Sequence, residues 1–165
     1  MPSRQFSAAI VGGAWPCTDP SSFQSASEVQ HQKALTLLEC AERTRADAER
    51  VRADQSGDLV DGFTGACHRH AARYVQQADQ WLSISRISAE CAWLTDGLRE
   101  ELDGIDDRAH QAIDQILRTA TGPSAALASQ RVMAVVTAAR AEATAKGVEY
   151  SASIGAKGAE IGAGS

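Results

Sequence analysis

Apolar residues recur along most of this chain at the three- and four-residue steps of a helix. The clearest row begins near residue 64 and includes Cys67, Ala71, Tyr74, Ala78, Trp81, Ile84, Ile87, Cys91, Leu94, Leu98, Leu102 and Ile105. It continues in phase beyond Gly104, and one internal glycine costs a packed helix only ~1 kcal/mol. The pattern therefore predicts a single helix over about 64–120, with a kink near Gly104 as the alternative.

Two further helices are predicted, one on each side of this long one. Asp19-Pro20 is a typical helix start, because Asp suits the N-cap and Pro suits the first helical position, and apolar spacing then predicts a helix over about 20–55. Residues 56–62 carry two glycines and two aspartates, which is typical of a turn. Thr121-Gly122-Pro123 ends the long helix, and a third helix is expected from about 124 to about 153.

These elements divide the chain into an irregular segment (1–18), a helical hairpin or bundle domain (19–153) and a glycine-rich flexible tail or linker (154–165). A short turn between long helices forces them to be antiparallel. The predicted fold class is therefore all-α: an elongated antiparallel helical hairpin with a long second helix and a third helix folding back. Part of the apolar row is expected to stay uncovered, and such surface usually awaits a partner.

Composition and charge narrow the classes of function. Hydrophobic residues make up 44% of the chain but aromatic residues only 5%, and such an alanine-rich, aromatic-poor composition suits helices. A net charge of -5 argues against nucleic-acid binding. No apolar run approaches the ~18 residues of a membrane span, and the N-terminus lacks a convincing secretory signal. We expect a protein that is cytoplasmic or is exported without such a signal.

Residues with potential for chemistry are present, but their spacing favours no site. The four cysteines match no zinc or redox motif and are expected to be reduced. The histidines of Cys67–His70 point in different directions on a helix, so they cannot converge on a metal. The carboxylate pairs Glu100-Glu101 and Asp106-Asp107 lack the cleft that catalysis needs, and His110 is expected to face solvent. We predict no catalytic, cofactor or metal site.

The large aromatic residues are the candidates for binding a partner. Trp81 and Trp93 lie twelve residues apart, so they project about 120° from one another on a helix. Trp81 fits the apolar row and is expected in the core. Trp93 falls at the edge of the row, either packed under a neighbour or exposed as an anchor. We take Trp15, Trp93 and Tyr74 as candidate partner-binding residues, with Trp15 either capping the hairpin's open end or docking a partner.

Several short motifs carry a resemblance to a known family. Phe63-Thr64-Gly65, followed by alanines, resembles the W-x-G turn motif of the secreted helical hairpins of type VII secretion, with Phe in the place of Trp. Gly12-Gly13-Ala14-Trp15, Trp93 and the break at Gly122-Pro123-Ser124 are similar to features of the N-terminal domains of ESX secretion-associated (Esp-type) proteins. The resemblance covers about residues 12–153 and implies that Phe63 closes the end of the hairpin while Gly65 permits close packing.

The resemblance also implies a function, namely a non-catalytic interaction domain of type VII secretion. The family's export signal, Tyr-x-x-x-Asp/Glu, is absent, since Ala78 and Ile154 stand four residues after Tyr74 and Tyr150. Members without that signal are carried by a partner or act as chaperones. The resemblance thus implies a secreted substrate or a substrate-binding chaperone, cytoplasmic or exported by this route, that binds a helical-hairpin secretion partner, its cognate substrate or its chaperone.

Two alternatives stay open. The glycine-rich end is also typical of a linker, so the chain could be the N-terminal delivery domain of a longer toxin that continues beyond Ser165. The near-heptad spacing of the long helix also fits a self-associating structural coiled coil, that is, a homo-oligomer.

Overall fold

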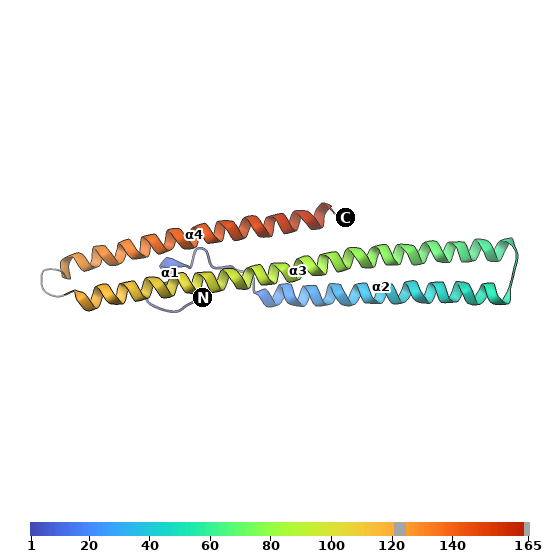
Figure 1. Cartoon of the computed structure of the whole chain (residues 1–165), viewed down its shortest axis with the longest axis horizontal. Coiled ribbons are helices and arrows are strands. Elements are labelled where there is room, and N and C mark those ends of the chain that lie inside the picture. The colour runs from blue at the N-terminus through green and yellow to red at the C-terminus, as the bar shows by residue number, and fades with distance from the viewer. Residues whose placement is uncertain (121–124, 164–165) are drawn as a thin grey trace. The chain divides into compact units, whose positions relative to one another are not determined.

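The computed structural model describes residues 1–120 and 125–163. These residues form four helices and no strand: α1 (Ser7–Ile10), α2 (Pro20–Asp54), α3 (Asp58–Thr119) and α4 (Ala125–Ala163) (Figure 1). The predicted all-α fold class is confirmed. The chain divides into two compact units. The core unit contains Met1–Pro20 and Cys91–Gly158, and the hairpin unit contains Ser21–Glu90 together with the described residues from Ala159 onward.

The long helix α3 is continuous through Gly104, as the phase of its apolar row predicts. A Cβ at Gly104 would meet only the guanidinium of Arg108, at 3.5 Å. The residues on either side are buried, with Leu102 at 0% and Ile105 at 3% exposure. Their packing offsets the ~1 kcal/mol that a glycine costs within a helix.

The turn between α2 and α3 is shorter than the predicted range of 56–62. Gly57 is the one residue in the described part of the chain with a positive φ, of 117°, a conformation that glycine adopts without steric cost. Its carbonyl oxygen accepts hydrogen bonds from the amides of Val60 (2.9 Å) and Asp61 (3.1 Å). Two carboxylates, Asp58 and Asp61, lie in the first turn of α3, where the helix dipole favours negative charge. The helix therefore begins at Asp58, and the prediction for 58–62 was wrong.

The seam of the hairpin unit is built from small residues at seven-residue intervals. The Ser27 and Ser85 hydroxyls each donate to the other's backbone carbonyl oxygen, at 2.8 and 2.9 Å, so these residues lie level on the two helices. Seven-residue steps from this pair, taken in opposite directions along antiparallel helices, place buried residues opposite one another: Ala34 with Ala78, Ala41 with Ala71, and Ala48 with Thr64. Small side chains at every level allow close approach of the two helices.

Helix α4 ends at Ala163, ten residues beyond the predicted end. The flexible tail expected over 154–165 is therefore wrong for 154–163, and residues 164–165 lie outside the described part. Gly155, Gly158 and Gly162 each weaken the helix by ~1 kcal/mol relative to alanine. Ile154 and Ile161 are half-buried on the same stretch, and this burial opposes the glycine cost.

The core unit contains larger side chains than the hairpin. The second part of α3 and the facing part of α4 lie antiparallel (Figure 1), so the predicted folding back of the third helix is confirmed. Their shared cluster of buried residues comprises Leu98, Leu102, Ile105, Ala109 and Ile113 of α3 with Val132, Val136, Ala139 and Ala143 of α4, and it also includes Ile10 and Val11 of the N-terminal segment. The core is thus formed by three parts of the sequence.

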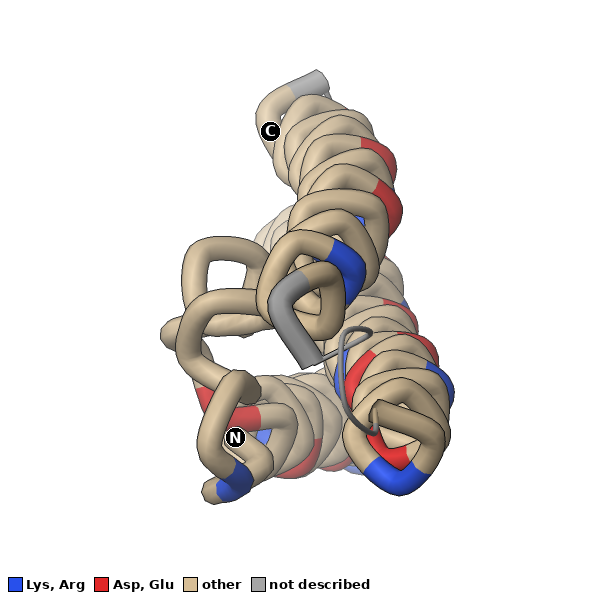
Figure 2. The backbone as a smooth tube through the Cα atoms, turned by 90° about the vertical axis from the view of Figure 1, so that its left-hand side faces the viewer, with Lys and Arg blue, Asp and Glu red and all other residues tan. Residues whose placement is uncertain are grey.

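The N-terminal segment (residues 1–18), predicted to be irregular, contains the short helix α1 and packs on this core. Figure 2 shows it on one side of the α3–α4 pair. A Cβ at Gly12 would overlap the carbonyl oxygen of Ala8, so this turn requires glycine, whereas Gly13 has open space. A Cβ at Gly147 of α4 would lie 3.2 Å from that of Ala14, so Gly147 lets the segment lie directly against the helix.

Candidate interaction surface

Trp93 lies on a side of α3 that the other described parts of the core unit leave largely open. Its side chain is 74% exposed, which resolves the two predicted alternatives in favour of exposure. At 100° per residue, Leu94 and Leu98, which pack toward α4 and the core, project about 100–140° away from Trp93, and Leu102 projects about 180° away. Asp106, which binds Ser7 of the N-terminal segment, projects about 140° away from Trp93 on the other side. The buried contacts of α4 and of the N-terminal segment therefore lie on faces of α3 other than that of Trp93.

A hollow of about 160 Å³ opens beside Trp93, between α3 and α4. Its apolar lining includes Leu94 and Leu98 from α3 and the ring of Tyr150 from α4. The Tyr150 hydroxyl lies 2.9 Å from Oγ1 of the fully buried Thr95, and Thr95 donates to the carbonyl oxygen of Cys91 at 2.7 Å. This chain of hydrogen bonds holds the Tyr150 ring in one position, so the apolar base of the hollow is already formed before a partner binds.

One rim of the hollow is closed by an ion-pair bridge between the helices. The Lys146 ammonium of α4 lies 3.1 Å from Glu101 of α3 and 3.5 Å from Glu149, one turn further along α4. The hydrogen bond to Glu101, together with the negative charges of Glu101 and Glu149, raises the pKa of Lys146 above its ordinary value. Lys146 thus offsets one of the two negative charges on this rim. We call Trp93, the hollow and this bridge the Trp93 surface.

The other predicted partner-binding residues are less available. The Trp15 side chain is half-buried against the core cluster, and its amide donates to the Val11 carbonyl oxygen at 2.9 Å. Trp15 therefore helps to hold the N-terminal segment against the core. This placement does not favour its predicted role in docking a partner. Tyr74 is half-buried in the hairpin unit. The structure does not bring these two residues and Trp93 into one surface.

The motif Phe63-Thr64-Gly65 lies within the first turns of α3 and not in the turn, so its predicted placement was wrong. Phe63 is 49% exposed, whereas Thr64 is buried and donates to the carbonyl oxygen of Val60 at 3.0 Å. Val60 and Thr64 therefore close this end of the hairpin instead of Phe63. A Cβ at Gly65 would make only ordinary contact with the Arg69 side chain, so glycine is not sterically required there.

A buried polar cluster ties the N-terminal segment to α3, and the sequence pattern did not predict it. The Ser7 hydroxyl donates to Asp106 Oδ2 at 2.8 Å, and both residues are almost fully buried. His110 Nδ1 lies 2.8 Å from the backbone oxygen of Asp106, and its side chain is only 13% exposed, so its predicted exposure was wrong. Phe6 packs on the His110 ring at a centroid distance of 6.3 Å.

This cluster combines a serine, an aspartate and a histidine, but in an arrangement unlike a nucleophile with its base. The hydroxyl donates directly to the carboxylate, and no contact joins it to the imidazole among the interactions of the described residues. A catalytic serine needs a base within hydrogen-bond reach. The geometry instead suits a structural contact that attaches the N-terminal segment to α3. The neighbouring ion pair of Arg4 with Asp107 strengthens the same attachment. One signal was visible in the sequence, because Asp106 lies in phase between Leu102 and Ala109.

The remaining predicted features are spread over the fold. The four cysteines, all in the described part of the chain, form no disulfide; Cys17 is exposed and Cys91 is buried. Within residues 1–120 and 125–163, no three His, Cys, Asp or Glu side chains converge as a metal site would need. None of the helices in that same part of the chain combines the length and the apolar character required to cross a membrane.

Comparison of this chain with protein-family models, with curated proteins and with solved structures finds no match.

Proposed function

We propose that this chain is a non-catalytic docking domain that binds a helical protein partner through the Trp93 surface. The observation that carries the proposal is the 74% exposure of Trp93 beside an apolar hollow whose floor is fixed by Tyr150. Tryptophan is enriched at the energetic centres of protein interfaces, particularly where a partner side chain can fill an adjoining pocket. Helical partners commonly bind by placing one apolar side chain per turn into such a groove.

The setting that we propose for this docking is type VII secretion, as substrate or as substrate-binding chaperone. This part of the proposal is supported by the sequence motifs alone. Of these motifs, Gly12-Gly13-Ala14-Trp15 has a clear structural role in positioning the N-terminal segment. The partner would then be a small helical-hairpin secretion protein.

The test is co-purification of the full chain with small helical-hairpin proteins encoded at type VII loci, followed by calorimetry of any complex. Trp93→Ala should weaken binding about 30-fold or more, the effect of losing an interface centre worth ~2 kcal/mol. Leu59→Ala is the matched control, because Leu59 is on the same helix and is 88% exposed but lies in the hairpin unit. Equal affinity of both variants would refute the assignment of the surface, and absence of any complex would refute the secretion setting.

A further inference from the structure

The negative charge of this protein is concentrated on the part of α3 that carries Trp93. Residues 91–119 contain seven carboxylates and three arginines, a net charge of -4, against -5 for the whole chain. Two of the arginines bind other parts of the core unit: Arg99 pairs with Asp19 at 3.6 Å, and Arg108 pairs with Glu142 of α4 at 2.7 Å. Arg4 of the N-terminal segment pairs with Asp107 and also interacts electrostatically with Asp103. Little positive charge is therefore left to offset Asp96 and Glu100.

Three of these carboxylates form a row along one flank of Trp93. At 100° per residue, Asp96, Glu100 and Asp103 project about 60°, 20° and 80° from the direction of Trp93, all on the same side. All three are exposed, and none forms an ion pair within the described residues. Like charges three and four residues apart destabilise a helix by a few tenths of a kcal/mol per pair, so a cation from outside the chain would relieve this repulsion.

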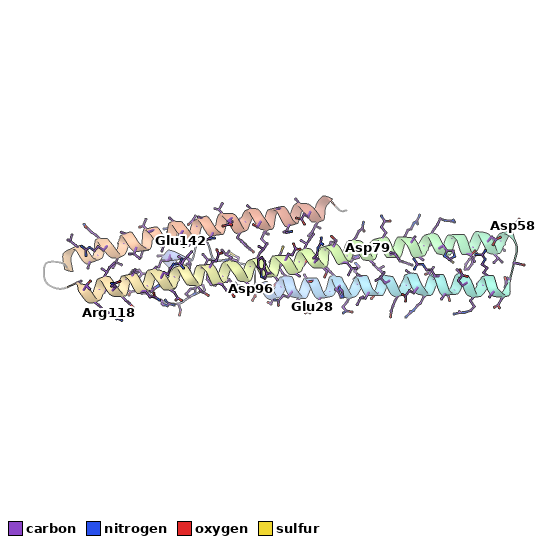
Figure 3. The ribbon with its side chains drawn as sticks, in the orientation of Figure 1. Glu28, Asp58, Asp79, Asp96, Arg118 and Glu142 are labelled. Atoms are coloured by element: carbon purple, nitrogen blue, oxygen red, sulfur yellow. The ribbon has the colours of Figure 1, made fainter. Side chains whose placement is uncertain are left out.

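The two flanks of Trp93 thus differ in charge. On the α4 side Lys146 pairs with both carboxylates of the rim and offsets one of their two charges, whereas Asp96 and Glu100 on the other side form no ion pair within the described residues. Figure 3 marks Asp96 on α3. The open face of the indole is also a favourable place for a cation, and the chain itself uses this contact elsewhere, where Lys33 Nζ lies 3.8 Å from the ring centroid of Trp81.

From this charge complementarity we infer that the partner at the Trp93 surface is a basic amphipathic helix of another protein. The inference rests on the proposed docking function and specifies its ligand. One apolar side chain of the partner enters the hollow above Tyr150, and lysines or arginines one turn apart lie against Asp96 and Glu100. A four-residue interval spans about 6 Å on both helices, so two successive turns of the partner match the two carboxylates.

The experiment uses the full chain and two synthetic helical peptides with the same apolar row. One peptide carries lysine and the other glutamate at the positions flanking that row, and binding is measured by fluorescence anisotropy at low and physiological salt. The lysine peptide should bind about tenfold more tightly at low salt, and the difference should shrink as salt screens the charges. The double variant Asp96→Asn with Glu100→Gln should remove most of this difference in affinity between the two peptides. The control double variant, Glu28→Gln with Asp79→Asn, alters exposed carboxylates of the hairpin unit (Figure 3). It should leave the difference in affinity between the two peptides unchanged.

Each other outcome overturns the inference in a distinguishable way. Equal binding of both peptides that is lost in Trp93→Ala would keep the docking function and refute the basic partner. Binding of the lysine peptide that survives Trp93→Ala would mean adsorption by charge alone. No binding of either peptide at millimolar concentration would refute the docking surface itself. A dimer of the chain in light scattering that is lost in Trp93→Ala would make a second copy the occupant.

Discussion

Replacing Ala41 by leucine tests the register inferred for the hairpin unit. Ala41 is 1% exposed, and the seven-residue steps from the Ser27–Ser85 pair place it opposite Ala71, which is 0% exposed. Leucine adds three carbon atoms at a level where the seam holds only two methyl groups. Overpacking of a filled core costs about 1–3 kcal/mol.

Further loss is expected if the two helices separate to admit the leucine. The reciprocal hydrogen bonds of Ser27 and Ser85 are 2.8 and 2.9 Å long, and each contributes about 1 kcal/mol. Weakening both brings the expected destabilisation to about 2–4 kcal/mol. For a chain of this size, each kcal/mol lowers the melting temperature by about 2–4 °C.

The assay is urea and thermal unfolding followed by far-ultraviolet circular dichroism, with Ala46→Leu as the matched control. Ala46 is on the same helix but exposed, so its replacement should change stability by no more than about 0.5 kcal/mol. Helix propensity differs little between alanine and leucine, and the control accounts for that difference. If Ala41→Leu is as stable as Ala46→Leu, or more stable, the small-residue register is wrong.

Three more variants test the core unit and its N-terminal segment. Leu102→Ala should cost about 2–5 kcal/mol in urea unfolding, because Leu102 is 0% exposed at the centre of the core cluster; a cost below 1 kcal/mol would contradict that placement. Ser7→Ala should cost about 1–3 kcal/mol, because it leaves a buried carboxylate without its donor; unchanged stability would mean that the carboxylate finds another partner. Gly147→Leu should displace residues 13–15 and make them sensitive to limited proteolysis, whereas Gly155→Leu, in open space, should not; equal protease resistance would refute the close contact.

The helices could be predicted from the sequence because their signals are local. The steps of the row around Leu102 correctly predicted that α3 is continuous and ends near residue 120, and the Asp19-Pro20 pair correctly predicted the start of α2. The turn was misplaced because glycine and aspartate occur both in turns and in the first turn of a helix, and only the backbone angle at Gly57 separates the two uses. Likewise, the glycines after residue 153 predicted a flexible tail, whereas packing of Ile154 and Ile161 accompanies a continued helix.

The contacts of the N-terminal segment could not be predicted, because they join residues about a hundred positions apart. Nothing in the neighbourhood of Ser7 indicates that its hydroxyl meets Asp106. In the sequence, Asp106 stands out only as one of a pair of carboxylates without a catalytic cleft, although it lies in phase with the buried row. Trp93 shows the same limit, since its position at the edge of the row left exposure undecided until α4 and the N-terminal segment were placed on other faces of α3.

The buried aspartate has a consequence for how the Trp93 surface is kept open. An ionised carboxylate without full hydrogen bonding is costly in a core, and Asp106 Oδ1 has no hydrogen-bond partner among the described residues. An apolar residue would pack there at lower cost but could not accept the Ser7 hydroxyl. The polar contact instead specifies one register for the N-terminal segment, with Ile10, Val11 and Trp15 against the core. Because Asp106, which binds Ser7, projects about 140° away from Trp93, the segment packs so that the Trp93 side chain stays exposed to a partner.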